Sequence, residues 1–193
     1  MTGFDYSLGL LTILMGLALA DICFSFHKLA IRARTIHWDG RVPLTAVLVV
    51  FECVRLWFAQ WTLRNLSAAL TFPVYLGLFV QMIVLVLLAT SCLPDDPSDD
   101  CDLRAFYEGR RRYFWGLFTA YFAMFFILWL VFGSTSVNGL ASADVVDWIR
   151  VLGPLVLFPL LIFSRRKWLD YAIPVAFILF YAARYWNATL TGG

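Results

Sequence analysis

Two charged residues, Glu52 and Arg55, stand three positions apart within the apolar run PLTAVLVVFECVRLWFAQWTL. This spacing places both side chains on one face of a helix, where a carboxylate and a guanidinium form an ion pair. An ionised residue at the centre of a membrane helix costs about 2.5 to 3.5 kcal/mol, so this face is expected to point toward protein or water. The pair is the first candidate for a functional site.

Asp21 supplies a second acid at a similar depth. At about 1.5 Å per residue along two antiparallel helices, Asp21 and Glu52 come to roughly 10 and 13 Å from the same membrane surface. If the two helices pack together, Asp21, Glu52 and Arg55 form a cluster of two acids around one base. Burial and the second carboxylate then keep one acid protonated over part of the pH range, as a proton or cation pathway requires. The alternative is an ion pair that only fixes helix packing.

A second polar stripe is expected in the last apolar segment. Asp170 and Arg184 lie fourteen residues apart on nearly the same helix face, with Tyr181 between them. The stripe predicts either an internal polar seam or a helix contact. Asp170 itself is close enough to the inner end of its segment to be interpreted as an ordinary headgroup residue.

The composition is typical of a membrane protein. Hydrophobic residues make up 62% of the 193 residues and charged residues 15%, whereas soluble domains carry about a quarter charged residues. A helix needs roughly 20 apolar residues to span a bilayer. The chain is therefore predicted to be all-α, a single six-span transmembrane domain over 1–193 with spans at about 7–27, 43–63, 68–91, 113–133, 145–164 and 168–187.

The distribution of Lys and Arg predicts the orientation, because basic residues collect on the cytoplasmic side. Eleven lie in the odd loops and two at the other surface. Both termini are therefore expected outside the cytoplasm. The eleven are Lys28, Arg32, Arg34, Arg41, Arg104, Arg110, Arg111, Arg112, Arg165, Arg166 and Lys167, against Arg64 and Arg184.

The loop 92–112 is the longest connection. Its first half is acidic and broken by prolines, and its second half is predicted to be a helix that Asp102 caps. Arg110, Arg111 and Arg112 are expected to lie among the headgroups. The acids lack the spacing and the closing Glu of a calcium loop, so no metal site is predicted.

The sequence offers no enzyme signature. No Gly-x-Ser-x-Gly or Cys-x-x-Cys motif is present, and no Lys lies within 168–187 to form a retinal Schiff base. His27 and His37 fall in one loop region and cannot supply paired haem ligands at the proper depth. No basic and aromatic surface for nucleic acid is visible. We expect neither catalysis, nor a cofactor, nor nucleic acid as a partner.

Four short segments resemble a family of small bacterial multi-span integral membrane proteins of unknown function. They are Ala18–Asp21, Leu93–Asp96, Asp102–Tyr107 and Arg111–Leu117. The resemblance implies a bacterial inner membrane and carries over no catalytic or binding residue.

Two functions follow as hypotheses. The first is passage of a proton or small cation, or of a solute coupled to one, with Asp21 and Glu52 as titrating or coordinating groups and Arg55 as counter-charge. The second is a non-transporting subunit or sensor that binds a partner through the cytoplasmic loop 92–112. In either case a homo-oligomer or a membrane-protein partner is expected, since Gly16 and Gly116 allow close helix contact.

Overall fold

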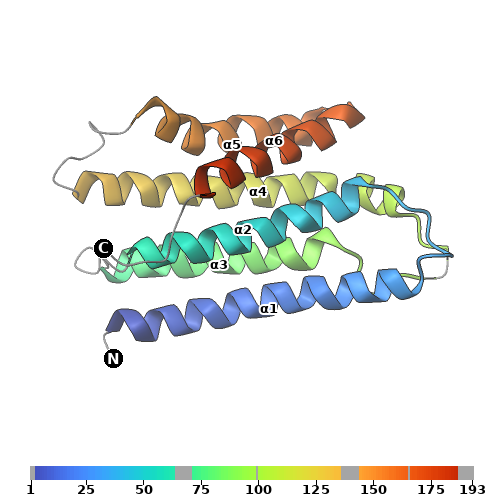
Figure 1. Cartoon of the computed structure of the whole chain (residues 1–193), viewed down its shortest axis with the longest axis horizontal. Coiled ribbons are helices and arrows are strands. Elements are labelled where there is room, and N and C mark those ends of the chain that lie inside the picture. Colours follow the sequence, from blue (N-terminus) through green and yellow to red (C-terminus); the bar gives the residue numbers. More distant parts are fainter. Residues whose placement is uncertain (1–2, 64–70, 99, 136–143, 165, 187–193) are drawn as a thin grey trace.

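The computed structural model is helical over the described residues (Figure 1). It describes residues 3–63, 71–98, 100–135, 144–164 and 166–186, without the side chains of 3–8, 60–63, 132–135 and 184. The predicted all-α class is confirmed for these residues. The elements are α1 (Gly3–Ile31), α2 (Arg41–Leu63), α3 (Phe72–Cys92), α4 (Leu103–Thr135), α5 (Val145–Phe163) and α6 (Lys167–Tyr185).

Five of the helices contain segments long and apolar enough to cross a membrane. A helix satisfies its backbone polar groups internally, so apolar helices of this length are consistent with an integral membrane protein. The described part of α6 is not among them, so a sixth span stays a prediction. The five segments are Gly9–Ile31, Arg41–Ala59, Phe72–Cys92, Leu103–Val131 and Val145–Phe163.

The helices lie side by side, with α1 at one side of the bundle and α5 with α6 at the other (Figure 1). Contacts join α1 to α3 and α2, α3 to α4, α4 to α5, and α2 to α6. Helix α1 packs more extensively on α3 than on α2. This difference determines which charged residues of α1, α2 and α3 lie close together.

Aromatic rings fill the space between α4, α5 and α6. Phe158 of α5 is fully buried, with its ring centroid 4.9 Å from that of Phe118 and 5.4 Å from that of Phe122. Phe177 of α6 lies 5.4 Å from both Phe122 and Phe158. Interlocked rings of this kind hold helices at a fixed spacing through area burial and edge-to-face contact. They fix the face that α6 turns inward.

The loops at one end of the bundle are tied together. The backbone N–H of His37 donates to the carbonyl of Cys101 at 3.0 Å, and that of Leu103 donates to His37 at 3.1 Å. Asp102 Oδ1 accepts from the backbone N–H of Arg104 at 2.8 Å. The predicted helix start and its cap are confirmed, and α4 continues from there into the predicted fourth span without a break.

Candidate functional site: a buried ion pair and a cationic cavity

Glu52 and Arg55 form an ion pair inside the bundle. Arg55 Nε lies 3.0 Å from Oε1 and 2.9 Å from Oε2 of Glu52, and Nη2 lies 2.8 Å from Oε2. The relative exposure is 0% for Glu52 and 3% for Arg55. The expectation that these charges turn away from lipid is therefore confirmed.

Aromatic side chains from two other helices enclose the guanidinium. Arg55 Cζ lies 5.0 Å from the ring centroid of Phe125, 5.1 Å from Tyr181 and 5.9 Å from Phe122. A cation over an aromatic face is attracted by the ring quadrupole, and more strongly where water is excluded. The hydroxyl of Tyr181 donates to the backbone carbonyl of Arg150 at 2.8 Å. The pair thus connects α2 with α4 and α6.

Asp21 belongs to a different group. It is partly buried, and the charges that act on it are those of Asp95 and Lys28. Lys28 Nζ in turn donates to the backbone carbonyl of Asp95 at 2.6 Å. Of the three residues of the expected cluster, the structure therefore brings together Glu52 and Arg55 but not Asp21. The reason is that α1 packs mainly on α3, which leads into Asp95, and less on α2.

Asp170 is the centre of a second buried network. It is 2% exposed, and its Oδ1 lies 3.0 Å from Arg111 Nη2 while its Oδ2 lies 3.5 Å from Arg41 Nη1. Its interpretation as a headgroup residue is wrong. A carboxylate in the first turn of α6 also interacts favourably with the N-terminal end of the helix dipole.

The side chain of Arg111 caps the C-terminal end of α5 instead of reaching the headgroups. Its Nε donates to the carbonyl of Leu161 at 2.7 Å, and its Nη2 donates to the carbonyl of Ser164. The last carbonyls of a helix have no partner within the helix, so a guanidinium supplies the missing donors. Arg111 shares a helix face with Trp115, which stacks on Phe158 of α5. Its neighbours Arg110 and Arg112 are exposed.

Arg41 is held at the start of α2 by Asp39. Asp39 Oδ1 accepts from Nε of Arg41 at 2.9 Å, and Oδ2 accepts from Nη2 at 2.6 Å. The guanidinium also lies over the ring of Tyr107, 4.5 Å from its centroid. The hydrogen bonds from Arg41 lower the pKa of the Asp39 carboxyl below its usual value. Asp39 therefore stays ionised at neutral pH.

This depressed pKa predicts an acid dependence of stability. A group whose pKa is lower in the folded state stabilises the fold fully above its unfolded value of 3.8 and loses that contribution as the pH falls further. In detergent, the difference in Tm between wild type and Asp39→Asn is expected to be constant near pH 6 and to shrink below about pH 4. A difference that stays constant down to pH 3 would contradict the prediction.

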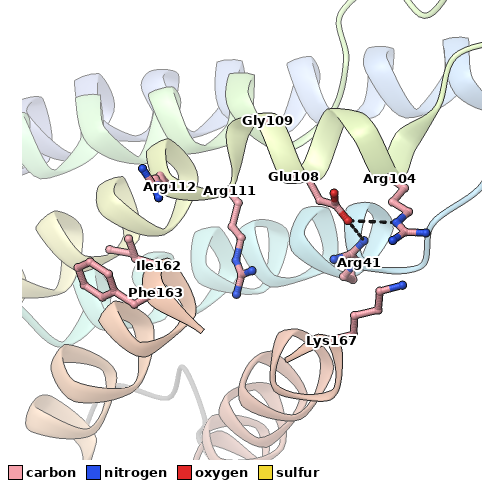
Figure 2. A pocket seen from close by; sticks show the side chains of 9 residues that line it. All are labelled: Arg41, Arg104, Glu108, Gly109, Arg111, Arg112, Ile162, Phe163 and Lys167. Atoms are coloured by element: carbon pink, nitrogen blue, oxygen red, sulfur yellow. Dashed lines mark hydrogen bonds and ion pairs between the residues drawn. The ribbon is translucent and has the colours of Figure 1, made fainter. Parts of the chain in front are cut away.

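Next to this network lies a cavity of about 690 Å³ (Figure 2). Its basic side chains come from three helices, with Arg41 on α2, three arginines on α4 and Lys167 on α6. Figure 2 shows Arg111 extending from α4 toward α6, while Lys167 extends from α6 toward the side where Arg41 and Arg104 lie. The complete lining is Arg41, Arg104, Glu108, Gly109, Arg111, Arg112, Ile162, Phe163 and Lys167.

The positive charge of the cavity is only partly compensated. Glu108 Oε1 lies 3.1 Å from Arg104 Nε and 3.5 Å from Arg41 Nη2. With Asp39 and Asp170 included, three carboxylates face five cations. Arg112 and Lys167 are exposed and form no ion pair within the described residues. An excess of positive charge on one concave surface raises the local concentration of anions, so the cavity favours an anion.

Helix α6 links the two sites. Asp170, Ile173, Phe177 and Tyr181 are buried along one of its faces, with Asp170 in the cavity network and Tyr181 beside Arg55. For Asp170 and Tyr181, the predicted polar stripe therefore lies on the inward face of α6. The side chain of Arg184 lies outside the described residues.

The Arg41, Asp170 and Arg111 network was not predicted from the sequence. Its members come from three helices, and Arg41 and Asp170 are 129 residues apart. The only indication in the sequence was their position. Each charged residue lies at the end of an apolar run, where it could equally interact with lipid headgroups. No protein-family model matches the chain, and no curated protein or solved structure shows significant similarity to it.

Proposed function

We propose that the protein is a non-transporting subunit or sensor of a bacterial inner membrane that binds an anionic group in its cationic cavity. The observation that carries the proposal is the convergence of five basic side chains on one cavity of about 690 Å³. Much of the lining, from Arg104 to Arg112, falls in the loop 92–112 for which a binding role was expected. In the proposed topology α6 is a sixth span, both termini lie outside the cytoplasm, and the cavity faces the cytoplasm.

The buried ion pair has a structural role in this proposal. Glu52 uses both carboxylate oxygens on Arg55, and aromatic rings surround the guanidinium. Neither residue lines the cationic cavity. A pair enclosed in this way fixes the position of α2 against α4 and α6. In this proposal the protein acts by binding alone, without catalysis and without a cofactor.

The test uses pyrophosphate as the anionic probe. In a non-ionic detergent, pyrophosphate is expected to raise the Tm of the wild type, because a ligand that binds only the folded state stabilises it. Gly109→Glu is expected to abolish the shift by placing a carboxylate in the cavity. Gly109→Ala is the matched control, since a Cβ at this position meets nothing within 4 Å. Equal shifts in both variants, or no shift in the wild type, would refute anion binding.

Ion passage is the second candidate, favoured by the complete burial of a titratable carboxyl, Glu52, midway along α2. The test is proton or cation flux into liposomes under an imposed gradient. Flux that Glu52→Gln abolishes, while Trp fluorescence shows that the variant is still folded in the liposomes, would support this candidate. Absence of flux in wild-type liposomes would exclude it.

A further inference from the structure

We propose that the anionic group bound in the cationic cavity is the phosphate of a membrane lipid, whose acyl chains lie along the exposed face of α5. This inference rests on the proposed function and names its ligand class. Three features carry it, namely the depth of the cavity, its spare donors and the apolar strip that begins at its edge.

The cavity lies at the ends of the apolar segments. Arg41 is the first residue of the candidate span Arg41–Ala59, and Phe163 is the last residue of Val145–Phe163. Lys167 opens α6 after a short connection. Phosphates of a bilayer lie at this level, just beyond the hydrocarbon core. Basic pockets between helices at this level are suited to lipid headgroups.

The donors of the cavity divide into fixed and spare groups. Arg41 and Arg111 are oriented by Asp39, Asp170 and the end of α5. Arg112 and Lys167 have no ion pair within the described residues, so their donors are available to a ligand. A guanidinium matches two phosphate oxygens at once, and an ammonium adds a point charge.

An apolar strip runs from the cavity along α5. Phe163 lines the cavity and is 83% exposed, while Leu160 and Val156 are 50% and 62% exposed. Their spacing of three and four residues places them on one helix face. A soluble phosphate makes no contact with this apolar strip. The acyl chain of a lipid whose headgroup fills the cavity lies directly against it. The neighbouring charge and apolar surface together therefore favour a lipid over a soluble anion.

The experiment compares three probes on delipidated protein in a non-ionic detergent. They are phosphatidylglycerol, its soluble headgroup glycerol phosphate, and phosphatidylcholine, with Tm and native mass spectrometry as readouts. Phosphatidylglycerol is expected to bind best. Arg112→Gln and Lys167→Gln are each expected to weaken this binding about fivefold. Arg110→Gln is the matched control, because Arg110 is exposed on the same helix but does not line this cavity.

A second variant separates the lipid inference from the proposed function. Phe163→Ser is expected to weaken binding of phosphatidylglycerol and to leave binding of glycerol phosphate unchanged. If glycerol phosphate binds as well as the lipid, the lipid inference fails and the proposed function stands. If neither binds, both fail. If phosphatidylcholine binds equally and Arg112→Gln has no effect, the cavity does not recognise an anionic lipid.

Discussion

Glu52→Gln is expected to lower the free energy of unfolding by about 3 to 5 kcal/mol, because it leaves a buried charge without its partner. Arg55 is 3% exposed and keeps its proton at any accessible pH, so the variant must hold a cation among the rings of Phe125 and Tyr181. Arg55→Met is expected to lower the free energy of unfolding as well, because it leaves the buried carboxylate of Glu52 without its cation. Unfolding in detergent by urea or heat, followed by Trp fluorescence, measures both.

The double variant Glu52→Gln/Arg55→Met tests whether the cost comes from the unpaired charge. It is expected to be more stable than Glu52→Gln alone, since an amide beside a thioether of similar volume leaves no buried charge. The coupling between the two changes should exceed about 1 kcal/mol, as in other residues that interact directly. If the double variant loses the sum of the single losses, the ion pair contributes little and the helices are held by the aromatic packing.

The ion pair was predictable because its two partners lie one turn apart on the same helix. Helix geometry alone brings Glu52 and Arg55 together, and the cost of charge in hydrocarbon then requires burial. The Asp102 cap was predictable for the same reason, since the side chain acts on the backbone two residues later. Features that depend on local spacing were therefore accessible from the sequence.

Features that depend on the choice of helix neighbours were not accessible. The predicted meeting of Asp21 with Glu52 required α1 to pack chiefly on α2, but α1 packs chiefly on α3. Arg111 and Asp170 are 59 residues apart, and only the packing of α4 against α5 and α6 brings them together. Both looked like headgroup residues because they lie at the ends of apolar runs in the sequence. The end of a helix inside a bundle offers carbonyls and charges that compete with headgroups for the same side chains.

Asp170→Asn is expected to lower the free energy of unfolding by about 2 to 4 kcal/mol, because it removes the carboxylate that Arg41 and Arg111 share. The loss should be smaller than for Glu52→Gln, since Arg41 keeps Asp39 and Arg111 keeps the carbonyl of Leu161. The same unfolding measurement in detergent applies.

The control for this change is Asp147→Asn, which alters a partly exposed acid 3.8 Å from Arg150 and should shift stability by less than about 1 kcal/mol. Asp170→Asn also has a functional consequence of opposite sign. Removing a negative charge beside the cavity raises its positive potential, so pyrophosphate should bind this variant more tightly although the fold is weaker. A parallel loss of stability and affinity would mean that Asp170 shapes the cavity chiefly by holding Arg111 in place.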